Sequence, residues 1–296
     1  MAKQSPSEKQ AILITGCSSG IGKATALRLA AGAERHGWVV YATARRPETL
    51  HELARAGCRT LALDVTDSDS MATAVATIEA RHGGVGVLVN NAGYCQAGAI
   101  EAVPMDRVNR QFATNVFGPI ELIQRVLPGM RRRGAGRIIN LSSMGGRLTF
   151  PGGGFYHATK YAIEALSDAL RFEVRGFGIA VVLIEPGLIK SGFSEAASSA
   201  MITEGDRAYD GFHDAIAKAT HDLYEKGMLA KLAGTPDDVA RAIERAVLAR
   251  RPKARYPVSP SARLLLTQRA LMSDRLWDAM MRTSFPSPSH ELAAGV

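Results

Sequence analysis

The residues best suited to chemistry in this sequence are Tyr156 and Lys160, which stand four apart at the start of a segment rich in helix formers. In a helix, this spacing places two side chains one turn apart on the same face. An isolated phenol has a pKa of about 10 and transfers protons poorly near neutrality, whereas a neighbouring ammonium group favours the phenolate. The pair could therefore give a proton to a developing alkoxide or take one from an alcohol. Such a pair also arises by chance, so its meaning depends on the elements around it.

A glycine-rich turn near the N-terminus predicts a dinucleotide site. Residues 11–15 form a short apolar run typical of a buried strand, Gly16–Gly22 contains three glycines, and a helix is expected over residues 23–36. In a βαβ unit, glycines let the backbone approach a pyrophosphate, and the helix N-terminus points N–H groups at it. An ordinary glycine turn is the alternative, but the flanking strand and helix favour the binding site.

The next expected strand, residues 38–44, ends at Arg45 and Arg46. A carboxylate at this place would bind the ribose hydroxyls of NAD, whereas an arginine accommodates the 2′-phosphate of NADP. Arg45 comes first after the strand, and its planar guanidinium suits a phosphate. Two solvated surface arginines are the alternative. The sequence thus favours NADP(H) over NAD(H).

Small and polar residues follow the strands that come next along the chain. Those strands are expected over residues 60–63, 87–89, 137–141, 179–184 and 254–258. The first four of them lead into Asp64 and Val65, into Asn91, Ala92 and Gly93, into Ser143, and into Pro186, Gly187, Ile189 and Ser191. A cofactor lies across the carboxyl ends of the strands in such a sheet, so these segments are expected to meet around it.

Two helices have informative residues. A long helix is expected over residues 106–133 with Asn115 in its middle, although asparagine is a mediocre helix former. Asn115 is either an exposed or cross-helix side chain, or it kinks the helix and holds water near the active site. A second helix begins at Thr235, a capping residue followed by proline, and is expected to reach about Arg250.

Composition excludes several classes of protein. The 296-residue chain is 46% hydrophobic, which suffices for a sizeable core, and it has no run of 18 uncharged apolar residues that could span a membrane. Three widely spaced cysteines suit reduced thiols in the cytoplasm, and the histidines and cysteines lack metal-ligand spacing, so no metal is expected. The net charge of +8 is mostly scattered, and without a recognised module it does not indicate nucleic-acid binding.

The joint pattern resembles the short-chain dehydrogenase/reductase family over roughly residues 9 to 258. The motifs that carry this resemblance are Thr15-Gly16-x-x-x-Gly20-x-Gly22, Asn90-Asn91-Ala92-Gly93, Asn115, Ser143, Tyr156-x-x-x-Lys160 and Pro186-Gly187. The style of the glycine turn and of the strand ending at Arg45 is most similar to the 17-beta-hydroxysteroid dehydrogenase and retinol dehydrogenase-like group. The resemblance implies one Rossmann-like α/β domain, a doubly wound parallel sheet in the order 3-2-1-4-5-6-7 with a helical substrate lid.

The resemblance also implies roles for individual residues. Tyr156 would be the general acid/base, Ser143 would bond the same substrate oxygen, Lys160 would lower the tyrosine pKa and bind the nicotinamide ribose, and Asn115 would hold a water. Ser19 and Arg45 would contact the 2′-phosphate. The expected cofactor-binding residues are Gly16, Ser18, Ser19, Gly20, Ile21, Gly22, Arg45, Asp64, Val65, Asn91, Ala92, Gly93, Tyr156, Lys160, Pro186, Gly187, Ile189 and Ser191.

The chain is expected to divide into a disordered leader (residues 1–10), the domain (11–283) and a loose tail (284–296). Within the domain, residues 192–234 would form a mobile substrate lid, although a plain surface insertion has a similar composition. A C-terminal amphipathic helix over residues 262–281 could cap the substrate pocket, pack on a partner subunit or touch a membrane surface. Stripes of this kind usually serve packing.

The expected activity is hydride transfer between NADP(H) and the carbonyl or secondary alcohol of an apolar substrate, with a steroid or retinoid as the leading candidate. The first alternative is a 3-oxoacyl-thioester reductase, for which Arg131–Arg133 would dock an acidic carrier. The second is a non-enzymatic NADP(H) sensor or scaffold, but such proteins usually lack the tyrosine or the lysine. The family also implies a homodimer or homotetramer that pairs the helices around residues 106–133 and 156–176.

Overall fold

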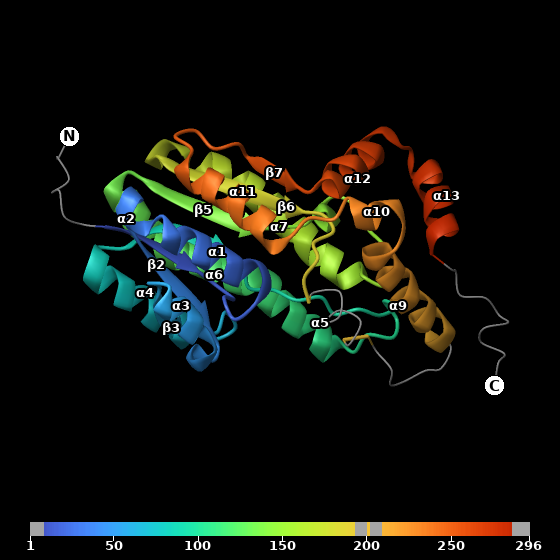
Figure 1. The fold of residues 1–296 in the computed structure, drawn as a ribbon, viewed down its shortest axis with the longest axis horizontal. Coiled ribbons are helices and arrows are strands. Elements are labelled where there is room, and N and C mark those ends of the chain that lie inside the picture. Colours follow the sequence, from blue (N-terminus) through green and yellow to red (C-terminus); the bar gives the residue numbers. More distant parts are fainter. Residues whose placement is uncertain (1–8, 193–199, 202–208, 286–296) are drawn as a thin grey trace.

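Seven parallel strands form the centre of the computed structural model, which describes residues 9–192, 200–201 and 209–285 (Figure 1). The strand order is β3-β2-β1-β4-β5-β6-β7, which confirms the predicted doubly wound sheet. The strands are β1 (Gln10–Ile14), β2 (Trp38–Ala44), β3 (Arg59–Ala62), β4 (Val85–Asn90), β5 (Gly136–Leu141), β6 (Ile179–Pro186) and β7 (Arg255–Val258).

Helices cover both faces of the sheet, so its central strands are apolar on both sides. Ile12 and Ile14 of β1 pack in one cluster with side chains of α1 (Gly20–Ala31) and α11 (Pro236–Leu248). Leu13, between them, packs in a second cluster with α4 (Ser68–His82) and α6 (Gly118–Arg133). The alternation follows from the two-residue period of a strand. Next to α6, α7 (Gly154–Glu173) packs along β6.

Side-chain caps fix where two of these helices begin. The Asp67 carboxylate accepts hydrogen bonds from the N–H groups of Asp69 and Ser70 at the start of α4. At α11, Thr235 and Asp238 form a reciprocal capping box. The start at Thr235 lies where the sequence predicts it, although α11 ends two residues before the expected Arg250. Caps are local chemistry, so a sequence can reveal them.

Three helices that were expected to be continuous are interrupted. The first expected helix is α1 followed by the short α2 (Ala33–His36), because the chain bends at Gly32. The second is α5 (Met105–Phe112) joined to α6 through a π-helix, η2 (Ala113–Phe117). The C-terminal helix is two helices, α12 (Pro260–Leu271) and α13 (Asp274–Ser284), because the hydroxyl of Ser273 caps a new start.

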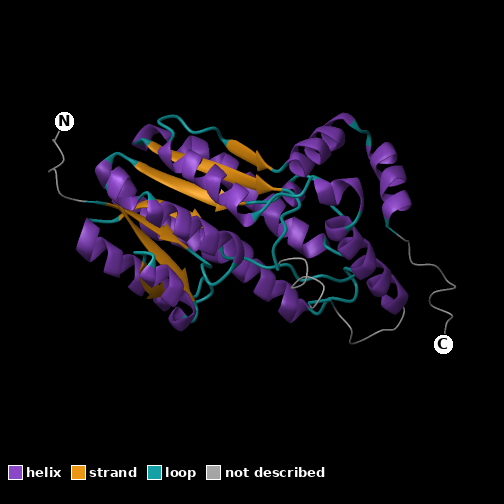
Figure 2. Cartoon of the chain, viewed as in Figure 1, coloured by secondary structure: helices purple, strands orange, loops and turns teal. Residues whose placement is uncertain are grey.

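Helices from the C-terminal third gather beside the carboxyl ends of the strands (Figures 1 and 2). The described part of the expected lid consists of α9 (Asp210–Glu225) and α10 (Gly227–Lys231), while residues 193–199 and 202–208 lie outside the described part. Leu265 and Trp277 of the C-terminal helices are buried against Leu148 and Leu188, so this pair of helices packs on the domain. Leu264 of α12 is instead exposed.

The two expected terminal segments are described only at their inner ends. Gln10 already belongs to β1, and residues 1–8 lie outside the described part. At the other end, Ser284 closes α13 and Phe285 is buried, while residues 286–296 lie outside the described part.

Short helical segments complete the described chain: η1 (Pro47–Leu50), α3 (His51–Arg55), η3 (Met144–Gly146) and η4 (Arg175–Phe177). Within the described residues, no helix has the length and apolar character needed to cross a membrane.

Candidate active site

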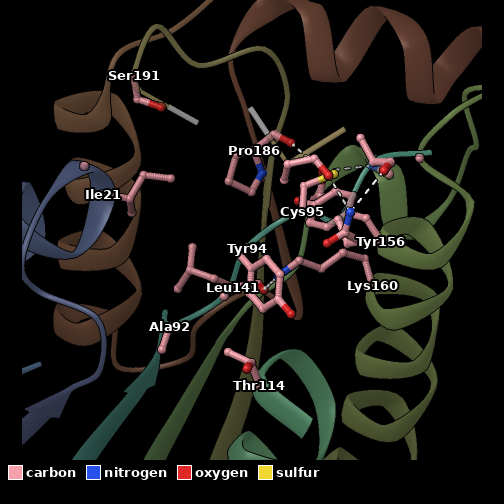
Figure 3. Close-up of a pocket in the computed structure, with 18 of the residues that line it drawn as sticks. Ile21, Ala92, Tyr94, Cys95, Thr114, Leu141, Tyr156, Lys160, Pro186 and Ser191 are labelled. Carbon is pink, nitrogen blue, oxygen red and sulfur yellow. Dashed lines mark hydrogen bonds between the residues drawn. The ribbon is translucent and has the colours of Figure 1, made fainter. Parts of the chain in front are cut away.

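A cavity of about 1260 Å³ runs along the carboxyl ends of the strands. Every residue that the sequence predicts for the site lines this cavity, with the exception of Asn115. Segments far apart in the chain therefore meet there: the turn after β1, the ends of β2 and β3, the segment after β4, and the starts of η3 and α7. Figure 3 shows part of this lining, with Tyr156, Lys160 and Cys95 on one side and Ile21 and Ala92 on the other.

The glycine turn is locked against the segment that follows β4. The Asn91 side-chain amide donates to the carbonyl oxygens of Thr15 and Gly16 at 2.8 and 3.1 Å. Gly16 has φ +70°, and a Cβ there would lie 2.8 Å from the Ala92 Cα; a Cβ at Gly22 would lie 2.2 Å from the Gly16 oxygen. No side chain fits at either place, so the backbone itself forms the cavity wall, as a bound pyrophosphate requires.

Two polar residues at this end of the cavity, Ser19 and Arg45, make no side-chain hydrogen bond or ion pair with a described residue. The Ser19 hydroxyl does not cap α1, although Ser19 is its N-cap residue. The exposed Arg45 guanidinium makes no ion pair or hydrogen bond within the described chain. A hydroxyl at a helix N-terminus beside a free guanidinium suits an anionic ligand. These residues fit the phosphate groups of a dinucleotide.

Two further arginines reach the same end of the cavity. Arg107 and Arg110 of α5 line it, and together with Arg45 they lie close enough to the Tyr94 phenol to lower its pKa. Burial acts in the opposite direction on this phenol and prevails, so the pKa of Tyr94 is raised. Tyr94, Arg107 and Arg110 were not predicted as site residues, although two arginines three apart at a helix start are a visible signal.

Tyr156 and Lys160 lie together on the wall of the cavity (Figure 3), and Ser143 lines it as well. Lys160 Nζ donates to the Leu141 carbonyl at 2.7 Å and lies 5.7 Å from the centre of the Tyr156 ring. Ser143 is hydrogen-bonded to Tyr156, and its Oγ accepts from the Gly145 N–H at 3.0 Å. A phenol, a hydroxyl and an ammonium group thus surround one point.

Burial is the main cause of the pKa shifts of Tyr156 and Lys160. It raises the pKa of Tyr156, and the hydrogen bond from Ser143 opposes the shift only in part. Burial also lowers the pKa of Lys160 to about 8, against the attraction of Glu164. The expectation that Lys160 lowers the phenol pKa stays a prediction, because in the protein by itself the net shift follows desolvation, which disfavours the phenolate. At neutral pH Tyr156 is a phenol and Lys160 is mostly an ammonium.

Asn115 lies behind the site, in the π-helix η2, and is 2% exposed. Its amide donates to the Tyr94 carbonyl at 2.9 Å and to the Thr159 hydroxyl at 3.1 Å, and its Oδ1 accepts from the Tyr94 N–H at 3.1 Å. The alternative of an exposed side chain is wrong, and the cross-helix contact is confirmed. The π-turn aims the amide at both the post-β4 segment and α7.

His157, next to Tyr156, is a structural residue. Its Nε2 accepts from the Phe150 N–H at 3.2 Å, and its Nδ1 lies 3.1 Å from the Gly145 carbonyl oxygen, to which it can donate only as the Nδ1–H tautomer. Burial lowers the pKa of His157 to about 4, so the ring is neutral at physiological pH. The side chain fixes the loop between Ser143 and α7.

A partly buried ion cluster lies next to the site. Arg255 of β7 pairs with Glu164 Oε2 at 3.0 Å, with Asp168 at 2.6 Å and with Glu185 at 3.2 Å. Glu164 stands one helical turn after Lys160, and Glu185 directly precedes Pro186. Burial raises the pKa of Glu185 to about 7, and the neighbouring Glu164 carboxylate adds to the shift. The cluster ties β6, β7 and α7 together beside the reacting groups.

The model of the short chain dehydrogenase family matches residues 10–201. This chain belongs to that family. A Bacillus subtilis relative named uncharacterized oxidoreductase YusZ is 35% identical, over 93% of this chain and 98% of its own. The 3-ketodihydrosphingosine reductase of Bacteroides thetaiotaomicron is 41% identical, over 68% of this chain and 72% of its own. Human 17-beta-hydroxysteroid dehydrogenase type 1 is 37% identical, over 83% and 76%.

Solved structures agree with the family assignment. A short-chain dehydrogenase from Streptomyces avermitilis superposes with a TM-score of 0.75 at 35% identity, covering 92% of this chain and 96% of that one. A serine dehydrogenase complexed with NADP+ superposes with a TM-score of 0.71 at 28% identity, covering 85% and 95%. The protein is thus an oxidoreductase of a family that uses a nicotinamide cofactor.

The substrate end of this short-chain dehydrogenase is the part that the sequence analysis described least. Its wall includes Cys95, Phe150, Leu188, Ile216, Tyr224 and Phe285. Tyr224 and Phe285 come from α9 and from the end of the chain, and only their apolar or aromatic character could have suggested a pocket.

Proposed function

We propose that this short-chain dehydrogenase transfers a hydride between NADP(H) and the carbonyl or secondary alcohol of an apolar substrate. The observation that carries the proposal is the convergence of Tyr156, Ser143 and Lys160 between the glycine turn and an apolar wall. When bound, the nicotinamide supplies or accepts the hydride. The side chains handle the proton and the charge on the substrate oxygen.

In the reductive direction, Tyr156 gives its proton to the developing alkoxide, and Ser143 donates a hydrogen bond to the same oxygen. The raised pKa of Tyr156 keeps the proton in place until the oxygen becomes basic. One N–H of the Lys160 ammonium group donates to the Leu141 carbonyl, and the other two can donate to a cofactor ribose. Asn115 positions Thr159 on the catalytic helix, and we assign to it the water that links Lys160 to solvent.

The proposed cofactor preference is NADP(H). Arg45 follows β2 directly and has no counter-charge within the described chain, and the Ser19 hydroxyl is similarly unused. An NAD-preferring site would instead place a carboxylate there. Ser191, at the far side of the cavity, would bond the carboxamide or a phosphate.

The substrate class rests on the apolar wall and on the names of relatives. A 17-beta-hydroxysteroid dehydrogenase and a 3-ketodihydrosphingosine reductase both resemble this chain, and a steroid or retinoid remains the leading candidate. Carrier docking is less favoured, because Arg131–Arg133 lie at the end of α6 that faces away from the cavity. There Arg133 bonds the carbonyl of Val85, at the start of β4.

A homodimer is the proposed assembly. Large apolar side chains point outward from α7 and from η2, where Phe172 is 71% and Phe117 is 61% exposed. An apolar helix face of this kind is covered when two copies associate through it. Sedimentation of the purified protein measures the assembly, and a monomer at micromolar concentration would contradict it.

The test of the proposed function is a fluorescence titration with NADPH and NADH, followed by a screen of apolar ketones under NADPH consumption. Tight NADPH binding, weaker NADH binding and ketone turnover are expected. A preference for NADH would overturn the assignment of Arg45. Binding of neither cofactor would show that the glycine turn is not a working site, and binding without any ketone turnover would favour a sensor.

A further inference from the structure

One face of α9 forms a wall of the cavity. Ile216, Thr220, Leu223 and Tyr224 line it at the three- and four-residue spacing of one helical face. The character of this face changes along the helix. Ile216 packs in an apolar cluster with Ala99 and Phe285, whereas Thr220 and Tyr224 bring hydroxyl groups.

The Tyr224 phenol lines the same cavity as the reacting groups. It is near enough to Cys95 and to Tyr156 for a charge on one group to affect the pKa of another. Its ring packs on the apolar cluster that contains Leu148 and Leu188, so the side chain is held in place. Its hydroxyl nevertheless makes no hydrogen bond to a described residue. Tyr224 is half-buried on the cavity wall, and a tyrosine hydroxyl in such a place usually finds a hydrogen-bond partner, so this one points to a ligand.

The charge of the surroundings indicates which ligand group fits. Burial raises the pKa of Tyr224 to about 12, so the hydroxyl remains a donor at physiological pH. The acidic side chains in the described lining, Asp64 and Asp106, belong to the cofactor end, after β3 and at the start of α5. A cationic amine would therefore have no counter-charge near Tyr224. A neutral oxygen acceptor fits.

We propose that Tyr224 is a specificity residue that donates a hydrogen bond to a second oxygen of the substrate, next to the carbonyl that is reduced. The inference rests on the proposed function. The substrate class is a ketone with a neighbouring hydroxyl or carbonyl group and an apolar remainder that extends along Ile216 and Phe285. Thr220, one turn earlier on the same face, offers a second hydroxyl to such a substrate.

The experiment compares two ketones of equal chain length, 3-hydroxy-2-decanone and 2-decanone, with wild type and Tyr224→Phe. The reaction is the same for both: the hydride comes from NADPH and the proton from Tyr156. The expected result is that the ratio of kcat/KM values, hydroxyketone over ketone, falls about tenfold in Tyr224→Phe, because a buried hydroxyl of the substrate then lacks its partner. A ratio readout separates recognition of the second oxygen from a general loss of activity.

Tyr256→Phe is the matched control, because the Tyr256 hydroxyl accepts from the Lys253 N–H and lies outside the cavity. It should leave the ratio at the wild-type value. Thr220→Val is a second variant at the same wall and should lower the ratio by a smaller factor. A ratio unchanged in Tyr224→Phe overturns this inference, whatever Thr220→Val shows, while the proposed function stands. Wild type that binds NADPH but turns over neither of these ketones nor any ketone of the wider screen overturns the proposed function, and the inference with it.

Discussion

The two ends of the cavity are built by different means. At the cofactor end, backbone turns at the strand ends form the wall, and Asn91 and Thr15 lock them with hydrogen bonds of 2.8 to 3.0 Å. At the substrate end, side chains from helices form the wall through apolar contacts. The first kind of wall fixes one ligand geometry, whereas the second can be changed by replacing single side chains.

The substrate end is also held by fewer polar contacts. His213 of α9 accepts from the Ala99 N–H at 3.0 Å, and Tyr209 donates to Glu101 at 2.7 Å. The apolar clusters there are small compared with the two that sandwich the sheet. Elements with few buried contacts open most easily, so we expect α9 to move when substrate enters. This difference predicts that substitutions at the cofactor end alter the affinity for NADPH, whereas substitutions at the substrate end alter KM for the substrate.

The largest expected effect lies where the two ends meet. Tyr156→Phe should lower kcat about 10³-fold, because the general acid is lost, while the Kd for NADPH stays within about twofold. Steady-state kinetics and fluorescence titration measure the two quantities. A variant that kept most of its rate would show that Tyr156 is not the acid.

At the cofactor end, Arg45→Gln should raise the Kd for NADPH about 10- to 100-fold and leave that for NADH nearly unchanged, because a charged hydrogen bond to the 2′-phosphate is lost. Arg46→Gln is a close control, since Arg46 is also exposed but does not line the cavity. Equal losses in both variants would mean that general charge, rather than Arg45, attracts the cofactor.

At the substrate end, Phe285→Ala should raise KM for an apolar ketone about tenfold, because an aromatic ring that is 7% exposed leaves the wall. The Kd for NADPH should not change. Leu271→Ala, at a side chain that is 83% exposed on α12, is the control and should change neither quantity. A lower NADPH affinity in Phe285→Ala would contradict the separation of the two ends.

The smallest expected effect is a pH dependence. Burial lowers the pKa of Lys160 to about 8, so the ammonium is present below that pH and is lost as the pH rises through it. Affinity for NADPH should therefore fall a few-fold between pH 7 and pH 9, as measured by titration. Lys160→Met should bind NADPH more weakly and with little change over this range. An unchanged slope in that variant would assign the titration to another group.

Local patterns in the sequence suffice for much of this protein. Apolar runs located the seven strands to within two residues, and a Thr-Pro-Asp-Asp start located α11. The glycine turn, Arg45 at a strand end and the Tyr156–Lys160 spacing identified a site that the fold does bring together. These features depend on residues close in sequence, whose period and turn chemistry are visible before folding.

Only the tertiary structure decided what depends on burial and on distant neighbours. The pKa of Tyr156 is raised because surrounding elements desolvate the phenol. The π-turn at Asn115 depends on hydrogen-bond partners in two other segments. The meeting of Tyr224 with Tyr156 joins residues 68 apart (224 − 156 = 68). No period or spacing in the sequence relates Tyr224 to Tyr156. The packing of helices at the sheet edge brings the two residues together.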